Sequence, residues 1–292
     1  MKRNLLTLLT FAAVLAALEV AGRNGAWDTR VLPLPSEVAA YIADAFTDGA
    51  RRDQLPAAVT ANATAATLGT ATSTTAASLW TAFAGSTLTE ALLVTLKRLV
   101  SGYLIGFLAG IPLGLLTARF NFFRETFGLV ALGMQGLPSV CWVPLALIWF
   151  RPTENAILFV VVMGTVWSLM LATEHGVRTV PPLYVRAART MGSRGLHLWW
   201  RVLLPAALPA VIGGMKQSWA FAWRSLMAAE IYVTILTGCG LGWLLHNGRE
   251  VLRMDQVMGV MLIIVIVGLT ADRILFAPAE NRIRARWGLD KN

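Results

Sequence analysis

The sequence RAARTMGSRGLHLWWRVLLPAALP, from Arg186 to Pro209, lies between two apolar runs and is rich in arginine and glycine. Pro181-Pro182 precedes it, and proline favours the first turn of a helix, so a short helix is expected over Leu183–Met191. Gly192 should end that helix, because glycine readily adopts the left-handed conformation that closes helices. Pro205 begins the next apolar run. The stretch therefore predicts a short helix that lies across one face of a membrane-embedded protein.

The composition of the whole chain is typical of a membrane protein. Of its 292 residues, 56% are hydrophobic and only 14% are charged, whereas soluble domains carry about 25% charged residues. The formal charge of +9 could indicate a nucleic-acid partner, but the basic residues lie mostly in short segments between apolar runs. Such a distribution is typical of loops on the cytoplasmic side of a bilayer.

Six apolar runs are candidates for membrane-spanning helices, which need about 20 residues each. They are Leu5–Ala21, Leu92–Ala118, Phe127–Phe150, Ala156–Thr173, Ala206–Leu236 and Val257–Phe276. The first run could also be a signal peptide, since Lys2 and Arg3 precede it, but no clean A-x-A cleavage site follows and we favour a retained helix. We therefore expect an all-α membrane protein with about six transmembrane helices.

The second run carries glycines at intervals of four residues, which form one ridge along a helix. They are Gly102, Gly106, Gly110 and Gly114. In lipid, a ridge of small residues lets helix backbones approach closely, because van der Waals contact drives association there. The ridge predicts tight helix packing and says nothing about a solute.

Two other runs hold polar or amphipathic residues that could line a path for a solute. They are Gln135, Ser139 and Trp142 in the third run, and Trp219, Trp223 and Arg224 in the fifth. The prolines that break the third run could expose a path or serve packing alone. Arg224 could meet an anionic solute, or pair with an acidic residue across helices. Glu230, six residues further along, would face Arg224 poorly on a straight helix.

The basic stretch itself offers groups for contact with another molecule. Arg186, Arg189 and Arg194 could meet carboxylates on a partner protein, while the small side chains of Ala187 and Ala188 would allow a close approach. The alternative is an amphipathic helix that rests on lipid headgroups.

The spacing of the stretch favours the protein partner. Ala187-Ala188 is followed by three residues, Gly192, nine residues and then Val202-x-Leu204-Pro205. This pattern matches the signature E-A-A-x3-G-x9-I-x-L-P, and the chain thereby resembles the membrane permease subunits of bacterial ABC importers.

The resemblance extends over most of residues 32–289, except an Ala/Thr-rich segment at about 48–86. The similar stretches are LPLPSEV (32–38), LLVTLKRLVSGYLIGFLAGIPLGLL (92–116), LPSVCWVPLALIWF (137–150), AWRSLMAAEI (222–231) and FAPAENRIRARWGL near the end. They are similar to the nitrate/sulfonate/taurine permease family. Two departures stand out: Arg186 takes the place of the motif glutamate, and Arg151-Pro152 follows Phe150 where the family often has glycine.

The resemblance implies a type I ABC importer permease fold, with a cytoplasmic coupling helix that docks on an ATP-hydrolysing subunit. The docking residues would be Arg186, Ala187, Ala188, Arg189, Gly192, Leu204 and Pro205. A periplasmic or lipid-anchored binding protein would deliver the solute, and two copies of the permease would pair. The chain has no G-x-x-x-x-G-K-[ST] phosphate loop, so we expect no cofactor here, with ATP and Mg bound by the partner.

We expect four regions in the inner membrane of a bacterial cell, with both termini cytoplasmic. Residues 1–21 would form an N-terminal transmembrane helix, and 22–90 a periplasmic segment with the Ala/Thr-rich insert. The permease core would cover 91–276, with its coupling loop at about 174–205. Residues 277–292 would form a basic cytoplasmic tail.

The expected function is import of a small anion, such as an aliphatic sulfonate or taurine, nitrate or bicarbonate. The alternatives are the same class of importer for a heterocyclic vitamin precursor, and a carrier or channel without a motor. An enzyme is not expected, because no catalytic cluster is evident and the histidines show no metal-ligand spacing. Which solute is carried stays open.

Overall fold

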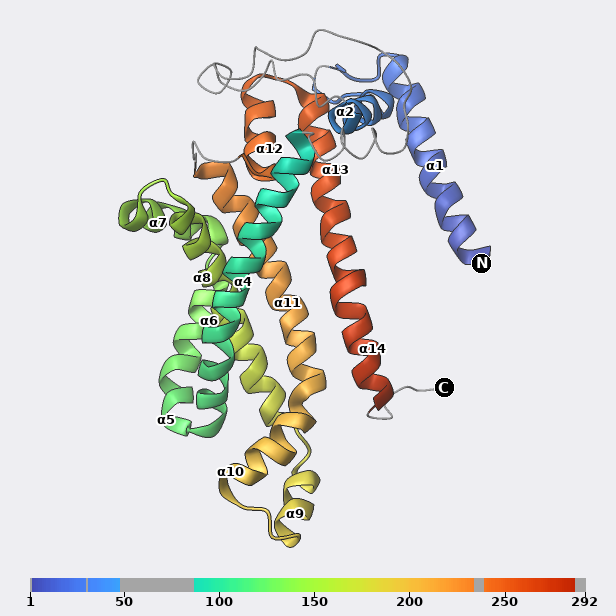
Figure 1. The fold of residues 1–292 in the computed structure, drawn as a ribbon. Helices are drawn as coiled ribbons and strands as arrows, with labels where there is room; N and C mark the ends of the chain where they lie inside the picture. Colours follow the sequence, from blue (N-terminus) through green and yellow to red (C-terminus); the bar gives the residue numbers. More distant parts are fainter. Residues whose placement is uncertain (1, 30, 48–86, 234–238, 287–292) are drawn as a thin grey trace, which may run out of the picture. The chain divides into compact units, whose positions relative to one another are not determined.

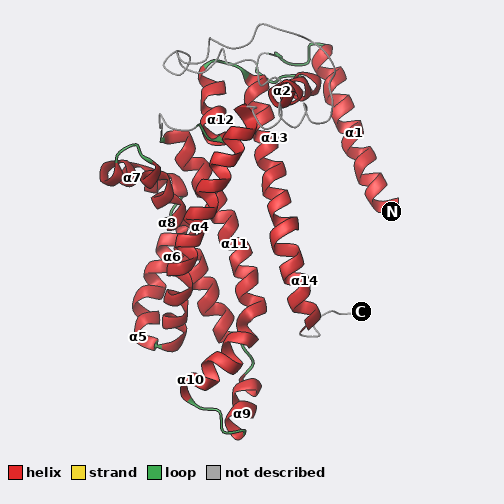
Figure 2. Cartoon of the chain, in the orientation of Figure 1, coloured by secondary structure: helices red, strands yellow, loops and turns green. Residues whose placement is uncertain are grey.

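The computed structural model describes residues 2–29, 31–47, 87–233 and 239–286, and Figure 1 follows them along the chain. Every regular element in these ranges is helical (Figure 2). The longer helices are α1 (Lys2–Arg23), α2 (Pro35–Thr47), α4 (Thr87–Arg119), α6 (Leu129–Gly136), α7 (Trp142–Phe150), α8 (Glu154–Arg178), α9 (Pro182–Thr190), α11 (Leu204–Tyr232), α12 (Leu241–Glu250), α13 (Met254–Ala271) and α14 (Ala277–Arg286). The predicted all-α membrane fold is confirmed.

Short helical segments join several of these helices. They are α5 (Asn121–Phe123), the π-helices η3 (Arg124–Gly128), η5 (Trp199–Leu203) and η6 (Asp272–Phe276), the 3₁₀ turn η4 (Ser139–Cys141) and α10 (Gly195–Leu198). The Ala/Thr-rich segment and the last residues of the predicted tail lie outside the described ranges.

Four continuous helical stretches of the described chain are long and apolar enough to cross a membrane. They are Thr87–Arg119, Glu154–Arg178, Gly195–Tyr232 and Met254–Ile283. A fifth span is formed if Asn121–Gly136 and Ser139–Phe150, which meet at a bend of 100°, are counted together. The run at Leu5–Ala21 does fold into a helix, α1, but α1 is not among these spans, so the described residues offer four or five of the about six expected.

The bend lies within the predicted span Phe127–Phe150, whose prolines were expected to break it. Helix α6 ends at Gly136, and Leu137 has an extended backbone with ψ 129°. The cause is Pro138, whose ring disfavours helical geometry in the residue before it. The segment is therefore broken in two, with η4 at the start of its second half.

The described chain divides into two compact units. The first comprises Met1–Val94 and Thr237–Ile263. In it, α1 and α2 are joined by the Glu19 carboxylate, which accepts hydrogen bonds from the backbone N–H and the hydroxyl of Ser36 at 3.1 and 2.8 Å. Tyr41 of α2 packs against Gly259 of α13. Burial raises the pKa of Tyr41 to about 12, so its phenol stays protonated.

The second unit comprises Thr95–Leu236 and Ile264–Asn292, and α8 lies at its core. The glycine ridge of α4 packs against α8: a methyl group on Gly102 would lie 2.6 Å from Val161, and one on Gly114 would lie 2.6 Å from the carbonyl oxygen of Met170. Helix α11 is equally close to α8, since a methyl group on Gly214 would meet Ala172 at 2.2 Å. Small residues thus bring three backbones together.

Candidate functional site

The arginine-rich stretch folds as predicted into a short helix, α9, which we call with its flanks the α9 loop (residues 179–194). The helix starts at Pro182 and ends at Thr190. Gly192 closes it with φ +84°. Its N–H donates to the carbonyl of Arg189 at 3.0 Å, and the N–H of Ser193 donates to that of Ala188 at 2.9 Å. The predicted glycine cap is confirmed.

The exposed surface of the α9 loop is both basic and apolar. Arg186, Ala187 and Arg189 are exposed, as is Gly192. Ala188 is only 2% exposed, so it packs inside the loop and offers nothing to a partner. Three apolar side chains are exposed nearby, namely Leu183, Tyr184 and Met191. Because no acidic residue occurs in 179–205, an acceptor for these arginines must come from elsewhere.

The α9 loop is connected to a long helix of the bundle. Residues Gly195–Tyr232 form one continuous helical stretch through α10, η5 and α11. Leu204 and Pro205, the last residues of the sequence motif, are half-buried at the start of α11. Trp199 in η5 has the Arg119 guanidinium 5.6 Å from its ring. The α9 loop therefore leads directly into the helical stretch that contains α11.

Three of the six residues proposed for a solute path are half-buried tryptophans that pack against the core of the second unit. Trp142 contacts the ring of Phe159 at 6.3 Å between centroids, and Trp219 contacts Tyr103 at 5.1 Å. Together with Trp223 they pack against one buried core cluster. The three tryptophans therefore support the bundle.

The polar members of the bent segment are placed differently. Ser139 accepts a hydrogen bond from the hydroxyl of Ser225 at 2.9 Å, which ties η4 to α11. Gln135 is half-buried near the end of α6. Gly136 and Pro138, at the bend itself, are exposed.

Arg224 is exposed on α11. Its guanidinium lies 5.0 Å from the ring of Phe221, and no carboxylate within the described ranges forms an ion pair with it. Gly213 and Gln217 are exposed too. At spacings of four and seven residues, the three positions share one face of the helix. We call this face the α11 stripe (Gly213, Gln217 and Arg224).

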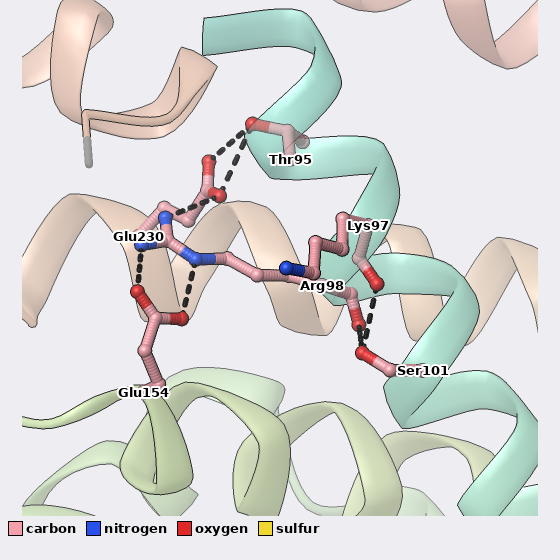
Figure 3. A network of polar contacts seen from close by, with 6 residues as sticks. All are labelled: Thr95, Lys97, Arg98, Ser101, Glu154 and Glu230. Carbon is pink, nitrogen blue, oxygen red and sulfur yellow. Dashed lines mark hydrogen bonds and ion pairs between the residues drawn. The ribbon is translucent and has the colours of Figure 1, made fainter. Parts of the chain in front are cut away.

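A buried ionic network joins α4, α8 and α11 (Figure 3). Arg98 donates from Nε and Nη2 to the two carboxylate oxygens of Glu154, at 2.8 and 2.5 Å. Its Nη1 donates to Glu230 at 3.0 Å. The Thr95 hydroxyl donates to the same Glu230 carboxylate, at 3.1 and 3.0 Å from its two oxygens. Glu230, considered as a partner of Arg224, is thus a partner of Arg98.

Sequence reasoning missed this network, although one signal for it was present. Arg98 lies inside the apolar run Leu92–Ala118. A charge within a membrane span is costly and is usually paired or functional. The same holds for Lys216 in the fifth run, whose ammonium group lies 2.7 Å from the Asp272 carboxylate of η6.

Comparisons with known proteins place the chain in a family. Residues 110–277 match the family described as the binding-protein-dependent transport system inner membrane component. The chain belongs to this family. It is a transport permease of the ABC importer type, as the sequence motif indicated.

Relatives agree with the permease assignment. A putative ABC transporter permease protein, MJ0413, of Methanocaldococcus jannaschii is 31% identical over 181 residues, which cover 62% of this permease and 67% of the relative. The putative aliphatic sulfonates transport permease protein SsuC of Escherichia coli is 32% identical over 154 residues, covering 53% and 57%. The nitrate import permease protein NrtB of Leptolyngbya laminosa is 26% identical over 181 residues, covering 62% and 64%. The permease thus spans roughly three fifths of these relatives' lengths.

A solved structure supports the fold. The inward-facing MetNI methionine ABC transporter has a chain that superposes on the permease with a TM-score of 0.56 at 19% identity. The match covers 68% of the permease and 95% of that chain. The type I importer architecture expected from the sequence is thereby confirmed.

Proposed function

We propose that the permease lines the translocation path of an ATP-driven importer for a small anion. The observation that carries the proposal is Arg224, a cation exposed on a membrane-spanning helix with no carboxylate paired to it among the described residues. Such a charge is costly in lipid and normally faces a bundle interior or a water-filled cavity. The relatives named for aliphatic sulfonates and nitrate support an anion of that kind.

The α11 stripe also supports a pair of permeases around one path. Gly213, Gln217 and Arg224 are all exposed in the single chain. A second copy facing this stripe would remove it from lipid and enclose a polar channel between two α11 helices. The solute would then pass between two Arg224 side chains.

The α9 loop is the proposed docking site for an ATPase subunit. It offers exposed arginines and exposed apolar side chains next to the small Ala187. The permease sequence has no phosphate loop, so ATP and Mg would be bound by that partner. With the α9 loop and both termini in the cytoplasm, which requires that α1 also crosses the membrane, a binding protein would deliver the solute to the opposite face.

Uptake by the reconstituted complex tests the anion proposal. The assay would use proteoliposomes that hold the permease, its ATPase and its binding protein, with labelled ethanesulfonate or nitrate outside. Arg224→Ala should reduce initial uptake by about tenfold or more, because a hydrogen bond to a charged group contributes about 1.5–3 kcal/mol. Arg224→Lys keeps the charge and should retain more activity.

Arg273→Ala, which removes an exposed arginine of η6, is the matched control and should leave uptake unchanged. Normal uptake by Arg224→Ala would remove Arg224 from the path. If the complex takes up an uncharged heterocycle in preference to either anion, the proposed class of solute is wrong.

A further inference from the structure

We infer that the Arg98 guanidinium is a second anion-binding site of the permease, in which the Glu154 carboxylate occupies the position that a solute anion would take. The inference rests on the proposed function for the class of solute. It is carried by the geometry of the network around Arg98 and by the different surroundings of its two carboxylates (Figure 3).

One edge of Arg98 has the geometry of an anion receptor. Its Nε and Nη2 atoms contact both oxygens of one carboxylate, at 2.8 and 2.5 Å. A guanidinium presents parallel donors that match carboxylates and other oxyanions in this bidentate manner. A sulfonate or nitrate presents two oxygens at similar spacing, so the same edge can bind it.

The other side of Arg98 is held in place. Nη1 contacts Glu230, whose side chain is only 1% exposed. Thr95 donates a hydrogen bond to that carboxylate as well. Arg98 and Glu230 together form a buried pair without net charge, which orients the guanidinium before any solute arrives.

Glu154 can leave Arg98 without leaving a charge buried. Its side chain is 44% exposed, and it lies in the first turn of α8. A carboxylate is stabilised there by the helix dipole and by water. If a solute anion replaces Glu154, Arg98 keeps two anionic partners and the buried pair with Glu230 is undisturbed. The Glu230 side chain is buried and also accepts a hydrogen bond from Thr95, so Glu154 is the partner proposed to exchange.

The exchange needs no movement of the helices. Gly102 of α4 fits against Val161 of α8 less than two turns from Glu154, and a methyl group at Gly102 would already collide at 2.6 Å. This packing holds the two backbones close together. Rotation of the half-exposed Glu154 side chain away from Arg98 would then free the Nε–Nη2 edge.

The location of Arg98 suits a first contact with solute. Glu154 is at the start of α8, and the α9 loop follows the end of α8. A helix of 25 residues is about 37 Å long. Under the proposed orientation, Arg98 lies near the outer face, where a binding protein would release the anion, and far from the ATPase.

Anion binding to the isolated permease tests this inference. The thermal unfolding midpoint would be measured in lipid nanodiscs at increasing sodium ethanesulfonate or sodium nitrate, since a ligand of the native state raises it. All variants carry Arg224→Ala, so that the α11 stripe does not contribute. Glu154→Gln should lower the half-saturating concentration by about tenfold or more, because it removes a tethered competitor.

Glu154→Asp, which keeps a carboxylate, is the matched control. It should bind the anion as weakly as the parent protein that retains Glu154. Adding Arg98→Lys to Glu154→Gln should abolish the tighter response. Equal half-saturating concentrations for Glu154→Gln and its parent would overturn the inference, as would tight binding that persists without Arg98. The uptake assay with Arg224→Ala alone is independent of these results, so the proposed function can stand if the Arg98 site fails.

Discussion

Arg98 holds two carboxylates whose surroundings differ sharply. The Glu230 side chain is 1% exposed, whereas that of Glu154 is 44% exposed. Breaking a buried ion pair leaves an uncompensated charge in a medium of low dielectric, while an exposed pair is weakened by solvent screening. The two glutamates therefore contribute unequally to stability, although both contact the same guanidinium.

This inequality predicts different losses on substitution. Glu230→Ala should lower the free energy of unfolding by about 3 kcal/mol or more, since it removes a buried partner of Arg98 and a hydrogen bond to Thr95. Glu154→Ala should cost about 1 kcal/mol or less. Unfolding in detergent, followed by circular dichroism, measures both. Equal losses would show that the two partners of Arg98 are equivalent.

At this scale the sequence allowed only part of the site to be predicted. Arg224 was recognisable as a charge within an apolar run, and the structure leaves it exposed. The pairing of Arg98 with Glu154 and Glu230 was not, because these residues lie 56 and 132 positions apart. Periodicity along one helix does not reveal which charges on other helices it will meet.

At the scale of elements, the glycine ridge sets how closely α4 approaches α8. A methyl group at Gly114 would lie 2.6 Å from the backbone carbonyl of Met170, which cannot rotate away. Gly114→Ala should therefore lower the thermal unfolding midpoint of the permease. Gly133→Ala in α6 is the control, because nothing lies within 4 Å of the added group. A similar drop for both variants would mean that helix packing at Gly114 is not the cause.

The end of α9 allows a test of docking that depends on backbone conformation alone. Gly192 has φ +84° and no atom within 4 Å of an added Cβ. Gly192→Val should disrupt the α9 loop, since β-branched residues rarely adopt positive φ, and the ATPase should no longer co-purify. Gly192→Asn tolerates that conformation and should retain the ATPase. If both variants lose the ATPase, docking does not depend on the positive φ of residue 192.

The sequence predicted elements well where the signal was local. The proline start and glycine end of α9 depend on neighbouring residues, and both were placed correctly to within one residue. The bend at Leu137–Pro138 was harder to place, because a proline in an apolar run either kinks a helix or ends it. Packing between helices decided that α8 receives the glycine ridge, which no local signal shows.

For the whole molecule, the exposed α11 stripe predicts contact between two permeases. With Cys141 and Cys239 replaced by serine, Gln217→Cys should cross-link to its counterpart in a second copy through a short bis-maleimide. Leu104→Cys, on an exposed face of α4, is the control and should not. Two results would contradict the proposed pair. One is cross-linking at position 104 but not at position 217, and the other is a native mass that corresponds to a single permease per complex.

The family of the protein could be predicted from its sequence, because the family motif combines several fixed spacings in one loop. The solute could not, for a physical reason. Trp142, Trp219 and Trp223 are half-buried and pack against the core of the second unit, so their place in the sequence does not separate packing from a path.

The continuous helix Gly195–Tyr232 has both of its irregularities near one end, the π-helix Trp199–Leu203 and Pro209. Beyond Pro209 the helix continues without a break to Tyr232, so we expect that segment to move as one body. If the α9 loop moves when ATP is hydrolysed, Gly213 and Arg224 would shift in the same instant. Fluorophores at these two depths would then record the motion with one shared rate constant, so the two levels of the stripe would change together and not in sequence.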